Sequence, residues 1–320
     1  VACEGGGKGI VIQRKGKNVF RGEGLSAITV EDPWGSWGGM AEEPESLSLS
    51  TVRDEWVVAK TELVEAGPLR GMLWVRMEGG KSSMELTCSV SRGRDAVDVS
   101  ARVLWNERSA RLKMVMPLAE KGETLRAEYQ VPGGTVVRGP SGEVPGGRWV
   151  RAGSFGFASD GIYNFDQKDG ELRATICRAT RYANDVNTPA DVEPWRAAVD
   201  AGELKFRFLI TSGGKDLPRL AAELEQGLIA LPVPPHGGEM GQEGSLAELS
   251  PESVEMLALK PAADGRGYVL RIRETANRAS RPRFVLGGRV VRLGVTEPGK
   301  IQTYRVVAGK ARAVSIVEEG

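Results

Sequence analysis

The residues best suited to bind a ligand lie together in one short segment, Asp32 to Gly39. This segment reads Asp-Pro-Trp-Gly-Ser-Trp-Gly-Gly and follows a strand-like stretch, so one carboxylate and two indoles share a Gly/Pro loop. An indole face stacks on the apolar C–H face of a pyranose, and a carboxylate accepts hydrogen bonds from sugar hydroxyls. Asp32, Trp34 and Trp37 are therefore candidate saccharide-binding residues. In the other interpretation, the indoles fold back and cover the end of a β-sandwich.

The sequence gives little support for a metal-binding site or a catalytic nucleophile. The one histidine, His236, stands in a Pro/Gly linker, whereas a zinc site with nitrogen ligands usually needs two or three histidines. The three cysteines, Cys3, Cys88 and Cys177, are too far apart for a disulfide framework or a zinc ribbon. Cys88 and Cys177 lie in strand-like stretches, which predicts small buried thiols. We therefore expect no metal ligand and no catalytic residue in this chain.

Composition excludes several classes of partner. The 43 lysines and arginines almost balance the 42 aspartates and glutamates, so the net charge of +1 offers no basic field to a nucleic acid. No apolar run is long enough to span a bilayer, which predicts no membrane partner. The first residues show no basic segment followed by an apolar one, as a signal peptide would. Together with the free thiols, this favours a cytoplasmic location.

Alternation of apolar and polar residues, with a period of two, dominates the chain. Val97, Val99, Ala101, Val103 and Trp105 fall on one face of a single predicted strand. Gly-rich turns at 78–81, 92–95 and 168–170 separate such strands at short spacing, which is typical of antiparallel sheets. Only residues 217–228 carry a helical apolar stripe. The sequence therefore predicts an all-β fold with one short helix.

A linker divides this pattern. Residues 231–238 are rich in proline and then glycine, and six further predicted strands follow from residue 254 onward. We expect a large β-sandwich domain at residues 1–250 and a small β-sandwich domain at 251–320, with the helix between the two sets of strands.

Short motifs in a fixed order resemble the C-terminal region of glycoside hydrolase family 38 α-mannosidases. In that family an Asp/Trp loop, a Gly-Pro-x-Arg segment, a Trp-x-Glu strand, a Leu-Lys strand and a Leu-x-Leu-Thr-Leu-Leu-Arg strand follow one another. Their counterparts in this chain are Asp32–Trp37, Gly67–Arg70, Val103–Glu107, Leu112–Leu118 and Leu172–Arg178, and further matches lie at Gly134–Pro140, Arg148–Val150, Gly161–Asp166, Asp200–Gly202, Ala258–Ala262, Leu270–Glu274 and Ile301–Tyr304.

The resemblance implies the role of a non-catalytic part of a retaining exo-α-mannosidase. In the family, an upstream domain supplies two catalytic carboxylates and a zinc ion that binds sugar hydroxyls. The large domain here would be a supersandwich of the galactose-mutarotase-like type. It would close the cleft of its own N-terminal catalytic domain around an α-mannoside, with zinc in that upstream domain and no cofactor in this chain. By motif match, Arg178 and Tyr163 join Asp32, Trp34 and Trp37 as candidate substrate-binding residues.

Some positions depart from the family pattern. Leu104, Asn164, Phe165 and Leu204 replace an aspartate, a glycine, a tyrosine and a histidine of the family, and Gly38-Gly39 ends the tryptophan loop. Two other functions stay open. The chain could be a stand-alone carbohydrate-binding module without hydrolase activity, or an epimerase or lyase with its own groove. The lone histidine weighs against the last of these.

Overall fold

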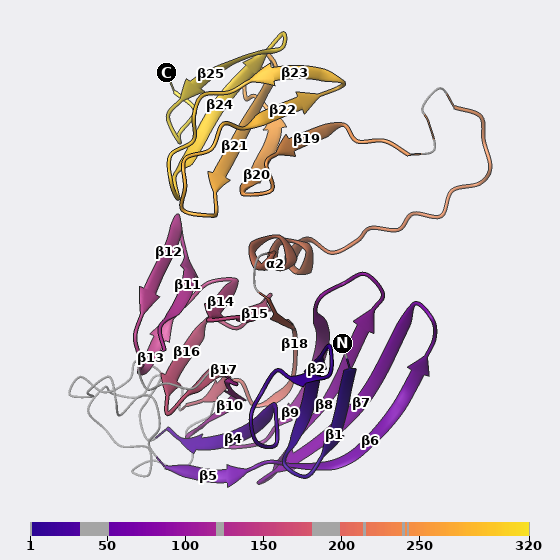
Figure 1. The fold of residues 1–320 in the computed structure, drawn as a ribbon, viewed down its shortest axis with the longest axis vertical. Coiled ribbons are helices and arrows are strands. Elements are labelled where there is room, and N and C mark those ends of the chain that lie inside the picture. Colours follow the sequence, from indigo (N-terminus) through magenta and orange to yellow (C-terminus); the bar gives the residue numbers. More distant parts are fainter. Residues whose placement is uncertain are drawn as a thin grey trace. The chain divides into compact units, whose positions relative to one another are not determined.

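The chain folds into two compact units, which are described separately. The computed structural model describes residues 2–32, 51–119, 125–180, 199–213, 216–238, 241 and 243–319. The large unit spans Val1–Gly227 without residues 132–135, and the small unit spans Leu228–Gly320 with Pro132–Thr135 (Figure 1). The predicted domain boundary at residue 250 stays a prediction.

A large antiparallel sheet forms one layer of the large unit. Among the described residues it has nine strands, in the spatial order β12 (Gly134–Arg138), β11 (Ala127–Val131), β14 (Trp149–Ala152), β15 (Phe155–Ser159), β18 (Gly202–Ser212), β9 (Val97–Trp105), β8 (Ser82–Ser91), β7 (Arg70–Gly79) and β6 (Val57–Ala66). The predicted alternation is confirmed on β9, where every second residue from Val97 to Trp105 is buried.

A smaller sheet forms the second layer. Its described strands follow the order β13 (Ser141–Pro145), β16 (Asn164–Lys168), β17 (Glu171–Ala179), β10 (Ala110–Pro117), β4 (Ser26–Glu31) and β5 (Val52–Glu55). The N-terminal strands β1 (Ala2–Gly6), β2 (Gly9–Arg14) and β3 (Lys17–Asn18) form a separate three-stranded sheet.

The core lies between the six-stranded and nine-stranded sheets. Phe157 of β15 lies in the middle, with its ring centroid 5.4 Å from that of Phe208 on β18 and 5.8 Å from that of Phe165 on β16. Because β16 belongs to the other sheet, these contacts join the two layers. Inward residues of both sheets thus form one hydrophobic cluster, as in a β-sandwich.

Tight turns connect the strands where the sequence predicts them. In the β16–β17 hairpin, Lys168 pairs with Glu171, and the two residues between them have positive φ angles of 55° (Asp169) and 73° (Gly170). Two successive positive φ angles are the signature of a type I′ turn, whose twist matches that of antiparallel strands. The hairpin predicted at residues 78–81 is confirmed by the pairing of Gly79 with Ser82.

The described residues contain one helix, α2 (Leu217–Gln226), which packs on the outer face of the nine-stranded sheet. Leu217 and Leu220 contact Trp149 and Leu209 in a second hydrophobic cluster. The helix ends before Leu228, the predicted end, because Gly227 adopts a positive φ of 67° and leaves the helical conformation. No helix among the described residues is long and apolar enough to cross a membrane.

The small unit is a second, smaller sandwich. Its described strands form a three-stranded sheet of β19 (Ala247–Ser250), β22 (Arg283–Leu286) and β23 (Arg289–Arg292), and a four-stranded sheet of β20 (Val254–Pro261), β21 (Tyr268–Glu274), β24 (Ile301–Val307) and β25 (Lys310–Val314). Phe284 and Val291 of the first sheet pack against Leu270, Ile272 and Tyr304 of the second. The predicted fold class, all-β with a large sandwich followed by a small one and a short helix between, is confirmed.

The buried cysteines generate a test of the core. Cys88 and Cys177 are free and buried, and burial raises the pKa of the Cys177 thiol to about 12, with a further contribution from the charge of Asp200. We expect a Cys3→Ala variant to show no reaction with an aromatic disulfide reagent at pH 8, because both remaining thiols are buried and the pKa of the Cys177 thiol is raised. Two thiols should react after urea denaturation, whereas a fast reaction of the folded protein would contradict this packing.

Candidate saccharide-binding site

The two faces of the six-stranded sheet differ in chemistry. On its central strand β10, Ala110, Leu112, Met114 and Met116 face the core, so the residues between them must point to the opposite, outer face. Two of those are charged, Arg111 and Lys113, yet both are buried. Burial of a charge is unfavourable unless an opposite charge and hydrogen bonds compensate it. The outer face must therefore supply carboxylates.

A β-bulge places Arg178 on this outer face. Leu112 of β10 pairs with Cys177 of β17, but Lys113 pairs with Thr175, so Ile176 is an extra residue without a direct partner. Ile176 and Cys177 both face the core. The bulge thus shifts the alternation by one residue, because two residues on one strand oppose a single one on the other. Arg173, Thr175 and Arg178 consequently share the outer face.

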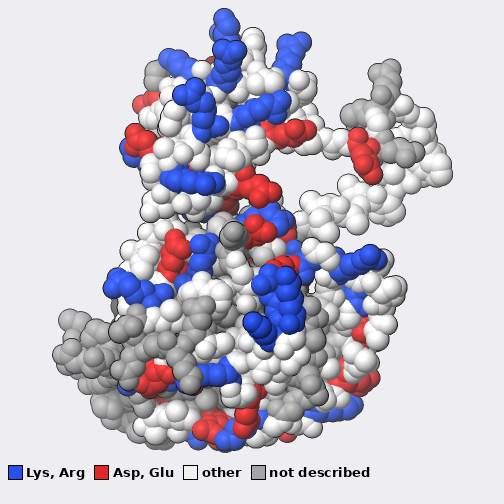
Figure 2. Space-filling view, viewed as in Figure 1, with Lys and Arg blue, Asp and Glu red and all other residues white. Residues whose placement is uncertain are grey.

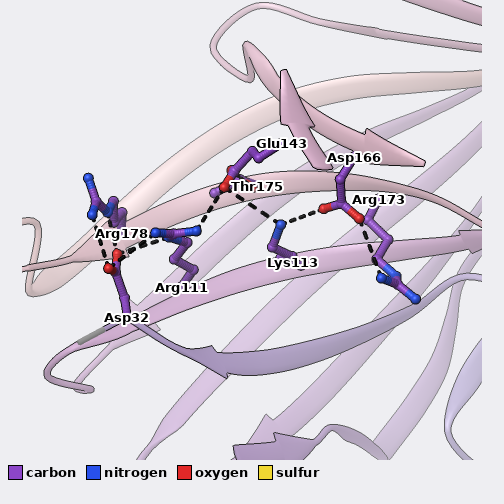
Figure 3. A network of polar contacts seen from close by, with 8 residues as sticks. All are labelled: Asp32, Arg111, Lys113, Glu143, Asp166, Arg173, Thr175 and Arg178. Atoms are coloured by element: carbon purple, nitrogen blue, oxygen red, sulfur yellow. Dashed lines mark hydrogen bonds and ion pairs between the residues drawn. The ribbon is translucent and has the colours of Figure 1, made fainter. Parts of the chain in front are cut away.

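Charges of alternating sign form a row across this face, and Figure 3 shows all of them except Glu171. In order, the row consists of Arg178, Asp32, Arg111, Glu143, Lys113, Asp166, Arg173 and Glu171, and each member forms an ion pair with the next. We call these eight side chains the charge row. They come from β17, β10, β13 and β16 and from the residue after β4. Four positive and four negative charges compensate one another, so the row is neutral.

Asp32 lies between Arg178 and Arg111 in the charge row and has no exposed surface. Its backbone N–H donates to the Ser109 carbonyl at 2.8 Å, which fixes the end of β4 against β10. Arg111 donates to both carboxylate oxygens, at 2.9 and 3.2 Å, and Arg178 also donates to both. Burial alone would raise the pKa of Asp32, but the hydrogen bond from Arg178 and the charges of both arginines outweigh it and lower that pKa below its ordinary value.

The middle of the charge row is its most buried part. Lys113 and Asp166 have no exposed side-chain surface and form a direct ion pair. Arg173 donates to the other Asp166 oxygen at 3.4 Å, and Lys113 lies 3.8 Å from Glu143. Burial raises the pKa of Asp166 above its ordinary value, although Lys113 and Arg173 oppose this shift.

Arg178 differs from the other cations of the charge row in its exposure. Its side chain is 30% exposed, whereas those of Arg111, Lys113 and Arg173 are at most 8% exposed. A guanidinium has five N–H donors in a rigid plane, and the bidentate contact with Asp32 holds that plane in one orientation. The Arg178 side chain is therefore both fixed and partly exposed. It is suited to donate hydrogen bonds to vicinal hydroxyls.

The structure brings together two of the five candidate substrate-binding residues, Asp32 and Arg178. Asp32 is buried and serves as the partner of Arg178. Tyr163 is 50% exposed, and its hydroxyl donates to the Asp160 carbonyl at 3.2 Å. The described contacts do not link it to the charge row. Trp34 and Trp37 lie outside the described residues.

Several members of the charge row were not predicted from the sequence. Arg111 and Glu143 were not singled out, and Lys113 and Asp166 entered only as parts of family motifs. The available signal was a charged residue at every second position of an otherwise apolar strand, Ala110-Arg111-Leu112-Lys113-Met114. That pattern is shared by any half-exposed strand. Only the paired sheet reveals that these charges are buried.

The described residues offer no metal site. No group of three or more His, Cys, Asp or Glu residues among them could hold a metal ion. The carboxylates of the charge row are each engaged by arginine or lysine. The donors in this part of the chain therefore do not fit a zinc ion.

The depressed pKa of Asp32 predicts a pH-dependent loss of stability in an Asp32→Asn variant. Its carboxylate stabilises the fold above the unfolded pKa of about 4 and loses this effect as the pH falls through the lower folded value. At pH 7 we expect the free energy of unfolding to fall by about 3 kcal/mol, because two arginines lose their shared counter-charge. Urea titrations at pH 7 and pH 3 measure this difference, which should shrink at the lower pH.

Asp95→Asn is the matched control. Asp95 also has a lowered pKa and a bidentate arginine partner, Arg14, but its side chain is 52% exposed. Exposed pairs contribute only about 0–1 kcal/mol, so this variant should stay close to the parent. Equal losses in the two variants would contradict the special position of Asp32.

The buried Lys113–Asp166 pair predicts strong coupling in a double-mutant cycle. Lys113→Met alone should lower the free energy of unfolding by about 3 kcal/mol, because Asp166 then loses its nearest counter-charge. Lys113→Met with Asp166→Leu should recover most of that loss, since no unpaired charge stays buried. Urea denaturation of the four proteins measures the coupling. Additive losses would show that the two charges act independently.

The sequence and the fold of this chain were compared with those of known proteins. The family model described as glycosyl hydrolases family 38 C-terminal domain matches residues 18–185, more than half of the chain. A solved protein of glycosyl hydrolase family 38 from Enterococcus faecalis superposes with a TM-score of 0.74 at 11% identity, over 92% of this chain and 41% of that one. An α-mannosidase from Enterococcus faecalis V583 gives a TM-score of 0.70 at 11% identity, over 92% and 40%.

These solved proteins share the fold, and the chain spans less than half the length of each. Comparison with curated protein sequences gives no match. The motif order, the two sandwiches and the matched residues agree. The chain belongs to the C-terminal domain family of glycosyl hydrolases family 38.

Proposed function

We propose that this chain is the cleft-shaping, saccharide-contacting part of a retaining family 38 α-mannosidase, which acts on terminal α-mannosides. The proposal rests on family membership and on one observation: the Arg178 side chain is 30% exposed, and its guanidinium forms a bidentate contact with Asp32. In this role Arg178 donates hydrogen bonds to hydroxyls of the bound sugar. Asp32, which is buried, orients that guanidinium and does not contact the sugar.

The residues that follow Asp32 in the sequence support a saccharide-binding role. Trp34 and Trp37 follow Asp32 by two and five positions. An indole that stacks on a sugar would complement the directed hydrogen bonds of a guanidinium, which is the usual chemistry of sugar recognition.

The bond-breaking chemistry would come from another part of the protein. A retaining glycosidase needs two carboxyl groups about 5–5.5 Å apart, and the family resemblance adds a zinc ion. The carboxylates of the charge row are each paired with a cation, and the described residues form no metal-binding group. We therefore expect this chain alone to show no α-mannosidase activity.

Arg178→Ala tests the proposed contact in the protein encoded by the whole open reading frame that contains this chain. With p-nitrophenyl α-mannoside and added zinc, we expect kcat/KM to fall at least about tenfold, chiefly through a higher KM, because a charge-assisted hydrogen bond to substrate is lost. Arg178→Lys should restore only part of this activity, since an ammonium lacks the planar fork.

Arg76→Ala is the matched control, because Arg76 is a partly exposed arginine paired with Glu78 at 2.8 Å on the other sheet. Its kinetics should equal those of the parent protein. Unchanged kinetics of Arg178→Ala would refute the proposed contact. If the whole protein binds saccharides but hydrolyses none of the α-mannosides offered, the chain is a carbohydrate-binding module, which is the alternative function.

A further inference from the structure

A hollow lies on the outer face of the nine-stranded sheet of the large unit. Its volume is about 500 Å³, and its lining includes Trp74, Thr87, Ser100, Arg102, Lys205 and Arg207. These residues belong to β7, β8, β9 and β18, which are neighbours in the sheet. We call this hollow the β7–β18 trough. It shares no lining residue with the charge row.

Strand register explains why the sheet is hollow there. Trp74 of β7 pairs with Thr87 of β8, Thr87 with Ser100 of β9, and Ser100 with Arg207 of β18. One row across the sheet thus runs from a large indole over two small hydroxyl side chains to a long guanidinium. Three strand spacings separate Trp74 from Arg207, a width of about 14 Å. The small residues form the floor and the large residues form the walls.

Charged groups in the trough largely compensate one another. Arg102 pairs with Glu203 at 2.8 Å and lies 3.6 Å from Glu85, and Arg207 pairs with Asp160 at 2.7 Å. Lys205 lies 3.1 Å from Glu203. Each cation in the trough thus has a carboxylate neighbour. The trough offers no concentrated charge to an ionic ligand.

Groups that suit a neutral polar ligand line the floor and one wall. Among the described residues, no side chain pairs with the indole N–H of Trp74 or with the hydroxyls of Thr87 and Ser100. Trp74 is half-buried, so its ring is held by the sheet while part of it stays accessible. Lys60, whose ammonium lies 5.6 Å from the ring centroid, comes from β6, on the opposite side of Trp74 from the trough floor.

We propose that the β7–β18 trough binds a neutral oligosaccharide, with Trp74 stacked on one pyranose and Thr87 and Ser100 bonded to its hydroxyls. An aromatic ring stacks on a sugar because C–H groups carry partial positive charge and the ring face is negative. The trough is about two pyranose rings wide and is open, so it fits part of a chain. This site is separate from Arg178, and its ligand binding does not depend on hydrolysis.

The test titrates the 320-residue chain with three neutral trisaccharides, α-1,6-mannotriose, maltotriose and cellotriose, by isothermal calorimetry, with trigalacturonate as the acidic counterpart. We expect at least one neutral trisaccharide to bind with a Kd in the millimolar range or below, and trigalacturonate to bind at least about tenfold more weakly. Trp74→Ala should weaken binding at least about tenfold, because the stacked ring is lost.

Two further variants test the site without the risk that loss of the large Trp74 side chain disturbs folding. Thr87→Val and Ser100→Ala retain Trp74 and should each weaken binding about threefold, because each removes one hydroxyl. Leu104→Ala is the matched control, since Leu104 is an exposed residue of β9 outside the trough. It should bind as the parent chain does.

Three outcomes would overturn the proposal: no neutral trisaccharide binds, Trp74→Ala binds as tightly as the parent, or trigalacturonate binds best. Arg178→Ala separates the two sites, because it should leave binding in the trough unchanged. Loss of all binding in Arg178→Ala with no effect of Trp74→Ala would refute the trough and leave the proposed function intact.

Discussion

The carboxylate of Asp32 is fully buried and ionised, and most of the outer face of the six-stranded sheet is organised to permit this. A buried carboxylate between two arginines leaves one positive charge in excess, so Arg111 needs a second partner, Glu143. Glu143 in turn lies beside Lys113, and Lys113 pairs with Asp166. Each added charge requires another until Glu171 ends the charge row. Neutrality is reached only across the whole row, which couples β4, β10, β13, β16 and β17.

This constraint explains how a rigid sheet can hold the proposed ligand-binding group, Arg178, in one orientation. Arg178 reaches the outer face because the bulge at Ile176 shifts the alternation of β17 by one residue. Asp32 then fixes the guanidinium plane, while the Arg178 side chain stays 30% exposed. The outer face of the nine-stranded sheet has a different arrangement, in which the partly exposed indole of Trp74 lies beside the small hydroxyl residues Thr87 and Ser100. On the large unit, basic and acidic side chains are interspersed over the surface drawn in Figure 2, in line with the net charge of +1.

The sequence predicted the fold better than the site. Alternation at Val97–Trp105 and the turn at Lys168–Gly170 depend on local geometry, and both are confirmed. The end of α2 was predicted two residues late, since the apolar stripe continues to Leu228 while Gly227 leaves the helical conformation. Strand alternation alone cannot show the bulge at Ile176, because an extra residue is defined by the partner strand. Without that bulge, Cys177 and not Arg178 would face outward.

The burial of Arg111 and Lys113 could not be predicted from the sequence either. Arg111 and Lys113 alternate with apolar residues as solvent-facing residues do on any half-exposed strand. Their partners Glu143 and Asp166 are 32 and 53 positions away from them, so only the topology of the sheet brings them together. Arg178 and Asp32, 146 positions apart, were singled out separately: Asp32 for the carboxylate beside two indoles in its loop, and Arg178 for its place in a motif that resembles the family. Neither observation predicted the ion pair between them.

A crystal structure of the whole protein with a bound, non-hydrolysed α-mannoside tests the central claim most directly. The account predicts that the Arg178 guanidinium donates to a sugar hydroxyl within about 3.2 Å, while its other edge keeps the bidentate contact with Asp32. A mannoside bound with Arg178 out of hydrogen-bond reach, or an Arg178 that leaves Asp32 to contact the sugar, would contradict it.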